Sequence, residues 1–144
     1  MTQGFPTSRP ISTKPSPDAV SRTPAGVLVL LRLENLAVAI AAVLAFRSDG
    51  GTWWLFAVLF LLPDLSMLGY LAGPSMGARF YNLAHTYVTP ALVAALGWAT
   101  DHGLWLQVAL IWCAHIGVDR TLGFGLKYAT SFADTHLGQL RRRG

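Results

Sequence analysis

The chain has 144 residues, of which 53% are hydrophobic and only 12% are charged, whereas roughly a quarter of the residues of a soluble globular protein are charged. The formal net charge of +4 does not indicate a nucleic-acid partner, because the basic residues lie at the chain ends and beside apolar runs, with no basic face interleaved with aromatics. The single cysteine, Cys113, excludes an intramolecular disulfide and a cysteine-based metal motif.

The first predicted element is an N-terminal tail. Residues 1–25 are rich in Pro, Ser and Thr and are predicted to be a disordered cytoplasmic tail. Four apolar runs follow at residues 27–46, 53–72, 80–99 and 104–122, each near the ~20 residues that cross a ~30 Å hydrocarbon core. Because the connections are short, residues 26–123 are predicted to form an all-α membrane protein with four transmembrane helices in an up-down bundle. Residues 124–144 are predicted to be a short interfacial and cytoplasmic C-terminal segment.

The flanking charges predict the orientation of this bundle in the bilayer. On one side lie Arg9, Lys14, Arg22, Arg32, Arg79, Arg120, Lys127 and the terminal arginines. The opposite side carries only Arg47. The positive-inside rule therefore predicts a multi-pass protein of the inner (plasma) membrane with both termini in the cytoplasm. The lipid bilayer is its expected partner.

Polar residues interrupt all four predicted spans, and an ionisable group within a bilayer is costly unless it is paired or faces a cavity. Helices one and three run outward and carry these residues in their first two turns, while helices two and four run inward and carry them in their second half. The polar residues should therefore converge in the cytoplasmic half of the bundle. The predicted polar pocket consists of Glu34, Asp64, Asn82, His85, His115, Asp119 and Arg120.

Several functions could use this pocket. One interpretation is a structural network of hydrogen bonds and ion pairs, or a site for a small ligand. The alternative is a membrane-embedded metal-dependent hydrolase, in which His85, His115, Asp119 and Asp64 bind a divalent metal such as zinc that acidifies a water. His115 and Asp119 share a helix face because they are four residues apart. The Pro63–Asp64 step should weaken the backbone ladder of the second span, and a kink there could turn Asp64 into the bundle. A transport or accessory role would require a homo-oligomer, because four helices rarely enclose a gated path.

Five strings resemble the bacterial domain-of-unknown-function family 4260, whose members are small integral membrane proteins: LRLENLAV, WWLFAVLFLLPDLSMLGYLAGP, ARFYNLAHTYVTP, IWCAHIGVDRTLGFGLKY and FADTHLG. The likeness covers residues 31–140 and implies a four-helix membrane protein, but it implies no activity. Asp134 and His136 also fall within these strings and are expected to be solvated. The Leu-Pro-Asp step at residues 62–64 is similar to one in membrane-bound metal-dependent hydrolases. The chain departs from their pattern at Ser66 and Met67, where a further acidic residue and a histidine would be expected.

Overall fold

The computed structural model describes residues 24–128, 134–135 and 138–139, and the predicted tail lies almost wholly outside them. The helices are α1 (Ala25–Ser48), α2 (Trp53–Phe60), the 3-10 helix η2 (Leu62–Ala72), α3 (Pro74–Ala84), α4 (Val88–Ala99) and α5 (Gly103–Leu122). Two antiparallel strands of two residues each follow, β1 (Asp134–Thr135) and β2 (Gly138–Gln139). The predicted helical fold class is therefore confirmed at this level.

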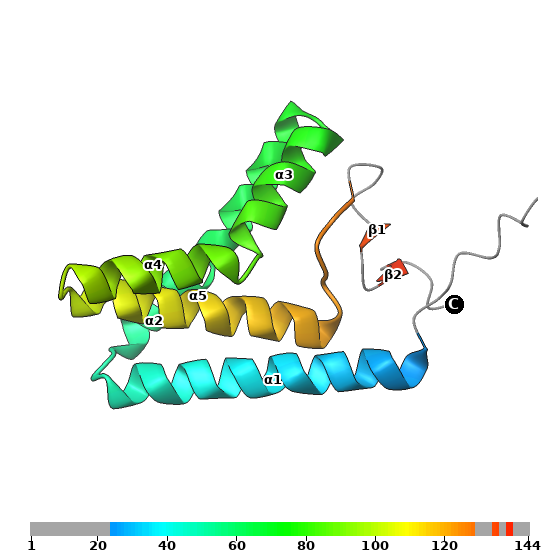
Figure 1. The fold of residues 1–144 in the computed structure, drawn as a ribbon. Coiled ribbons are helices and arrows are strands. Elements are labelled where there is room, and N and C mark those ends of the chain that lie inside the picture. Colours follow the sequence, from blue (N-terminus) through cyan, green and yellow to red (C-terminus); the bar gives the residue numbers. More distant parts are fainter. Residues whose placement is uncertain (1–23, 129–133, 136–137, 140–144) are drawn as a thin grey trace, which may run out of the picture.

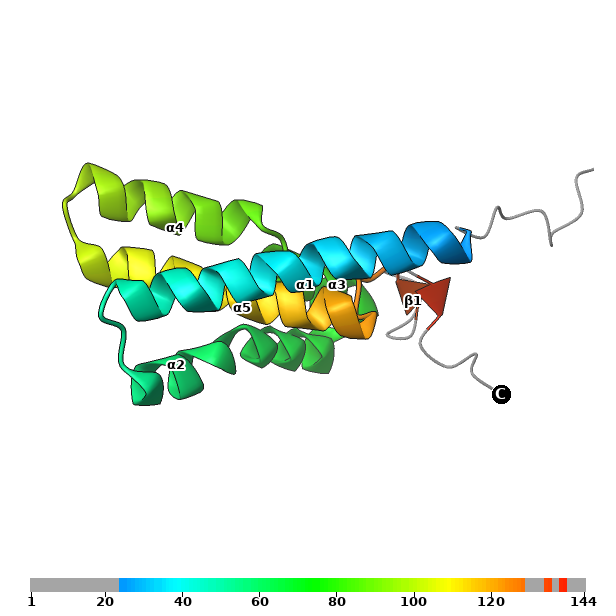
Figure 2. The ribbon, with the colours of Figure 1, turned by 90° about the horizontal axis from the view of Figure 1, so that it is seen from below.

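Helix α5 is the centre of the fold. Helices α1 and α4 pack along it, and α2 contacts it from a further side (Figures 1 and 2). Ile111 and Ile116 of α5 are fully buried. The loops α1–α2 and α4–α5 lie at one end of the molecule, and the beginning of α1 and the end of α5 lie at the other (Figure 1). This placement agrees with helices that run back and forth past one another.

Small residues bring α1 and α5 together. A Cβ atom added to Gly117 would lie 2.8 Å from the carbonyl oxygen of Asn35 and 2.9 Å from the Cβ of Ala39. Ala42 of α1 and Ala114 of α5 are also buried. Such small residues are typical of helix pairs in membranes, where close backbone contact replaces the hydrophobic driving force.

The second predicted span changes its helix type near its middle. The α-helical pattern ends at Phe60, and the eleven-residue helix η2 begins at Leu62. Pro63 has no N–H to donate, and the N–H of Asp64 donates to the carbonyl of Leu61 at 3.3 Å. A 3-10 helix of this length is uncommon, because such runs rarely exceed three or four residues. The expected weakening of the backbone ladder at Pro63 is therefore present.

The prediction of one helix over residues 80–99 is wrong. Helix α3 begins at Pro74, directly after Gly73 with its positive φ of 109°, and ends at Ala84; α4 begins only at Val88. Pro90 explains the break, because it cannot donate to the carbonyl four residues earlier and its ring disfavours a continuous helix. Helices η2 and α3 consequently form a hairpin that stands at an angle to α4 and α5 (Figure 1).

Two helical segments of the described chain are long and apolar enough to cross a membrane, namely Ala25–Ser48 and Trp53–Ala72. Helix α4 is apolar but shorter. Only 11% and 6% of the residues in the two apolar windows are buried, whereas the core helix of a soluble protein would be mostly buried. Large apolar side chains such as Leu71 and Trp98, each 88% exposed, cover much of the surface. This exposure favours a membrane environment.

Candidate metal centre

Four potential metal ligands from separate parts of the chain come together beside α5. The Nε2 atoms of His85 and His115 are 3.2 Å apart. Asp64 Oδ1 lies 3.6 Å from each of these nitrogens. Asp119 Oδ2 lies 3.5 Å from His85 Nε2 and 3.8 Å from His115 Nε2. All four atoms lie within 4.8 Å of one another, so each side chain directs one donor atom at a common point.

The fold positions these side chains through two structural units. His115 and Asp119 lie one turn apart on α5, so they share a face of that helix. Asp64 is in the first turn of η2, and His85 is the residue that ends α3. Because η2 and α3 are antiparallel, both residues lie at the base of the hairpin. The cluster therefore joins the hairpin to the central helix.

Tyr81 orients two members of the cluster. His85 Nδ1 lies 2.9 Å from the Tyr81 carbonyl oxygen, and donation of Nδ1–H to this oxygen leaves the Nε2 lone pair directed at the cluster. The Tyr81 ring stacks on the imidazole with centroids 3.8 Å apart. Its hydroxyl donates to Asp119 Oδ2 at 3.4 Å. Our sequence analysis missed Tyr81, although its position four residues before His85 is a signal that could have identified it.

The cluster has a buried side and an accessible side. His85 and His115 are 3% and 2% exposed, and the edge of the Phe60 ring covers the His115 imidazole. The Asp119 side chain is 20% exposed and that of Asp64 is 43% exposed. A ligand or water would therefore approach the cluster past Asp64.

His115 has one further notable feature. Its Nδ1 atom is buried and has no hydrogen-bond partner among the described residues. The imidazole therefore makes its polar contacts through Nε2, the atom that faces the cluster.

Asn82 and Arg120 lie next to the cluster and do not belong to its inner set. The Asn82 side chain donates to the carbonyl of Lys127 at 2.8 Å and accepts from its N–H at 2.7 Å, which fixes the chain after α5. Arg120 Nη2 donates to the carbonyl of His85 at 3.3 Å, and its guanidinium lies 4.8 Å from the centre of the Tyr87 ring. Arg120 therefore supports the ligand His85 through its backbone, whereas Asn82 holds the segment that follows α5.

The structure does not bring Glu34 to the cluster, which corrects the predicted pocket. Glu34 is exposed on α1, while its neighbour Asn35 faces inward and accepts a hydrogen bond from Tyr87 Oη at 2.8 Å. Successive residues of an α-helix are rotated by about 100°, so a carboxylate one position from an inward residue can point outward.

Lys127 is a further residue that our sequence analysis placed at the membrane surface. The structure buries it, with 4% exposed, and its Nζ lies 4.8 Å from the centre of the Tyr81 ring. Burial lowers the pKa of the Lys127 ammonium, and the Asp119 carboxylate opposes this shift. The described C-terminal residues add the backbone of Asp134 in β1; His136 lies outside the described residues.

A model of the protein family described as Domain of unknown function (DUF4260) matches residues 28–140. No curated protein and no solved structure matches the chain. The chemistry of the cluster must therefore be inferred from its own residues.

Proposed function

The chain belongs to the family described as Domain of unknown function (DUF4260), and on that premise we propose that it is an integral membrane protein that binds one divalent metal ion. The ligands would be Asp64 Oδ1, His85 Nε2, His115 Nε2 and Asp119 Oδ2. Zinc is the ion that best suits two imidazoles and two carboxylates in a compact site.

The spacing of the donor atoms is the observation that carries this proposal. Tetrahedral zinc with ligand bonds near 2.0–2.1 Å requires donor atoms about 3.3 Å apart. The two histidine nitrogens are separated by 3.2 Å, and their distances to the carboxylate oxygens run from 3.5 to 3.8 Å. All four donor atoms lie within 4.8 Å of one another, so the two carboxylates would have to move inward to complete the shell. The His85 Nδ1 contact with the Tyr81 carbonyl supplies the outer support that zinc-binding histidines usually have.

Charge balance supports the same conclusion. Two ionised carboxylates and two neutral imidazoles carry a charge of about −2, which a divalent ion neutralises. Such compensation matters most where the surroundings are apolar, because an unpaired charge there is costly. Lys127, buried near Asp119, adds a positive charge at the edge of the site.

The exposure of Asp64 favours hydrolysis as the reaction class. Zinc that is closed off by four protein ligands is structural, whereas catalytic zinc keeps one position for water or substrate. His85, His115 and Asp119 would be the permanent ligands, and Asp64, whose side chain is 43% exposed, would be the ligand that gives up its position to water or substrate. When bound, the ion would lower the pKa of a coordinated water and polarise a carbonyl or phosphoryl oxygen.

A network without metal is the competing explanation. In that case the Nε2–H of one histidine would donate to the Nε2 atom of the other, and the carboxylates would lie beside this hydrogen bond at 3.5 to 3.8 Å from the nitrogens. The network would then only fix the packing of the hairpin on α5. Transport through an oligomer remains a third reading, and no contact among the described residues favours it.

We propose further that the helices cross the inner membrane four times, with both termini in the cytoplasm. Helix α1, the α2–η2 segment, residues 80–99 and α5 would make the crossings. The placement of the two chain ends of the helical domain at one end of the molecule supports this topology (Figure 1), as does the cationic excess of the segments that flank them. Residues 124–144 would lie on the cytoplasmic side.

Elemental analysis of the detergent-purified protein tests the metal proposal. The wild type should hold close to one equivalent of zinc, and His115→Ala should hold much less. Glu34→Gln is the matched control, because this exposed residue of α1 lies away from the cluster. Folded wild-type protein that takes up no zinc, manganese or other divalent ion would exclude the metal function and leave the structural network.

A further inference from the structure

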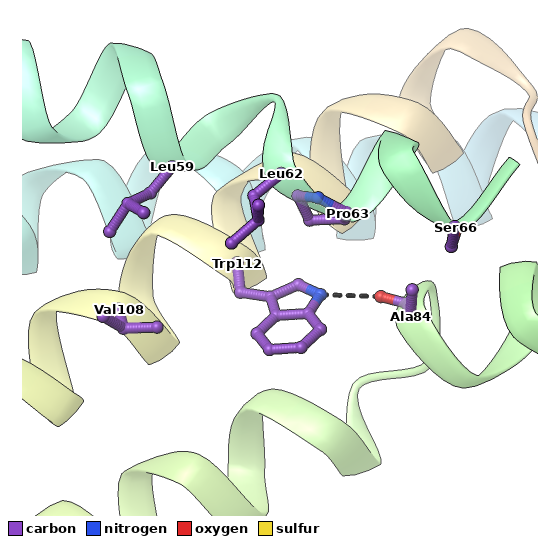
Figure 3. A pocket seen from close by; sticks show the side chains of 7 residues that line it. All are labelled: Leu59, Leu62, Pro63, Ser66, Ala84, Val108 and Trp112. Carbon is purple, nitrogen blue, oxygen red and sulfur yellow. Dashed lines mark hydrogen bonds between the residues drawn. The ribbon is translucent and has the colours of Figure 1, made fainter. Parts of the chain in front are cut away.

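An apolar cavity of about 170 Å³ lies beside the metal cluster. Its lining residues come from α2, η2, α3 and α5: Leu59, Leu62, Pro63, Ser66, Ala84, Val108 and Trp112 (Figure 3). The Trp112 indole N–H donates to the carbonyl of Ala84 at 2.6 Å, which fixes the ring across the cavity (Figure 3). The cavity therefore has a defined wall formed between α5 and the end of α3.

Each element that carries a proposed metal ligand also lines this cavity. On η2, Pro63 directly precedes Asp64, and on α3, Ala84 directly precedes His85. On α5, Trp112 lies one turn before His115. The same three parts of the chain therefore form the cavity and carry the ligands, although none of the four ligands itself lines the cavity. The polar end of a molecule in the cavity would have to extend past this wall to reach them.

The cavity suits a hydrocarbon chain that enters from the membrane. Leu62 lines it and is 51% exposed, so the cavity opens at the surface of Trp53–Ala72, a segment apolar enough to lie in a bilayer. Pockets that enclose a whole drug-sized ligand measure roughly 300–1,000 Å³. A cavity of about 170 Å³ would hold only part of a chain and leave the rest in the lipid.

One polar atom in this apolar wall also has no partner. Ser66 Oγ is buried without a hydrogen-bond partner among the described residues. Buried polar atoms of native proteins are nearly always hydrogen-bonded, so an orphan hydroxyl in a cavity wall calls for an explanation. An oxygen near the polar end of an amphiphile would provide the missing partner.

We propose that the cavity holds the hydrocarbon chain of a membrane amphiphile whose polar end reaches the metal, so that lipid-type molecules are the substrate class of this site. This inference rests on the proposed metal function. Its two independent supports are the continuity of the cavity with the ligand-bearing elements and the unpartnered Ser66 hydroxyl.

Alkyl hydroxamic acids provide the probe, because the hydroxamate group chelates zinc and the alkyl chain can be lengthened from acetohydroxamic to octanohydroxamic acid. Affinities would be measured by calorimetry on the zinc-loaded full chain in one detergent. Val108→Trp fills the cavity away from the ligands, and Val58→Trp, at a 62% exposed position of α2, is the matched control. Partition of the probe into micelles is the same for both variants, so their difference reports the cavity.

Burial of each methylene should tighten binding by about fourfold in the wild type and in Val58→Trp, up to the length that the cavity accepts. Val108→Trp should bind acetohydroxamic acid normally and octanohydroxamic acid on the order of tenfold more weakly than the control. Leu59→Ala, which widens the cavity, should move the limit to longer chains. The zinc content of every variant shows whether its metal centre is intact.

The two proposals fail in different ways. A protein that holds no zinc overturns the metal function and this inference with it. A protein that holds one equivalent of zinc, yet binds the long hydroxamate equally in Val108→Trp and Val58→Trp, overturns only the assignment of the cavity to a hydrocarbon chain.

Discussion

The Nε2 atoms of His85 and His115 face each other across 3.2 Å, although 30 residues separate them in the chain. Two imidazolium ions cannot occupy these positions without strong repulsion, whereas two neutral imidazoles with converging lone pairs can share one cation. Protons and a metal ion therefore compete for the same two atoms.

This competition predicts the pH dependence of metal binding. A histidine must be neutral to bind a metal, so acidification releases the ion and alkaline conditions retain it. Metal content should therefore be full near about pH 8 and should be mostly lost below about pH 5, as the imidazoles take up protons. Metal analysis after desalting at each pH measures this. A content that stays constant from neutral to acidic pH would contradict histidine ligation.

The unequal exposure of the two carboxylates predicts unequal roles. Asp64→Asn should weaken zinc binding on the order of tenfold, because water can take the accessible position; Asp119→Asn should weaken it more, because that side chain is also held by Tyr81. Competition with a chelator of known affinity measures both losses. Equal losses would indicate a closed, purely structural site and would count against hydrolysis.

Asn82→Ala should lower the free energy of unfolding without removing the metal. The substitution removes the two hydrogen bonds between the Asn82 side chain and the Lys127 backbone, so the expected loss is roughly 1–3 kcal/mol. Asn82→Asp keeps the acceptor for the Lys127 N–H and should lose less. Denaturation in detergent measures the loss of stability, and the zinc content shows whether the metal is retained. Complete loss of zinc from Asn82→Ala would show that Asn82 has a more direct role.

Gly117→Ala should destabilise the contact between α1 and α5. The added methyl group would meet the carbonyl of Asn35 and the side chain of Ala39 at less than 3.0 Å, and overpacking of this kind costs about 1–3 kcal/mol. Gly26→Ala is the control, since its Cβ would meet nothing within 4 Å and alanine favours a helix. Thermal unfolding of both variants provides the comparison. Equal melting temperatures would mean that α1 is free to shift away from α5.

Cysteine labelling tests the proposed topology. In a Cys113→Ala background, Asp49→Cys and Asp101→Cys should react with a membrane-impermeant maleimide in intact cells, because both loops are proposed to lie outside. Ser75→Cys, in the turn between η2 and α3, should react only after permeabilisation. Labelling of Ser75→Cys in intact cells would reverse the orientation or change the number of crossings.

The parts of the fold that could be predicted are those set by continuous local patterns. The apolar runs at residues 27–46 and 104–122 correspond to α1 and α5 within two residues at each end. The shared face of His115 and Asp119 followed from their spacing alone. The split between α3 and α4 was hidden because residues 80–99 are predominantly apolar and match the length of one span, although Pro90 carried the signal for it.

The parts that could not be predicted depend on rotation and on tertiary contacts. Glu34 was expected to face inward, and a single step along α1 turns it outward. Lys127 is buried against Tyr81 only because Asn82, a residue 45 positions earlier in the chain, holds its backbone. Neither the outward orientation of Glu34 nor the burial of Lys127 can be predicted from the periodicity of apolar residues in the sequence. The Leu-Pro-Asp step predicted a local weakening, but it did not predict that the weakened segment would continue as a long 3-10 helix.

The hairpin of η2 and α3 leans away from the rest of the molecule, and its two arms pack mainly against each other (Figure 1). At its base, Asp64 and His85 meet the two α5 ligands. An ion at this point would join the hairpin to α5. Its removal would release the base of the arm, so hydrogen exchange should rise across residues 62–84 while α1 and α5 keep their protection. Occupancy of the metal site would therefore limit the movement of the hairpin relative to α5. It would also limit the width of the cavity opening that faces the lipid.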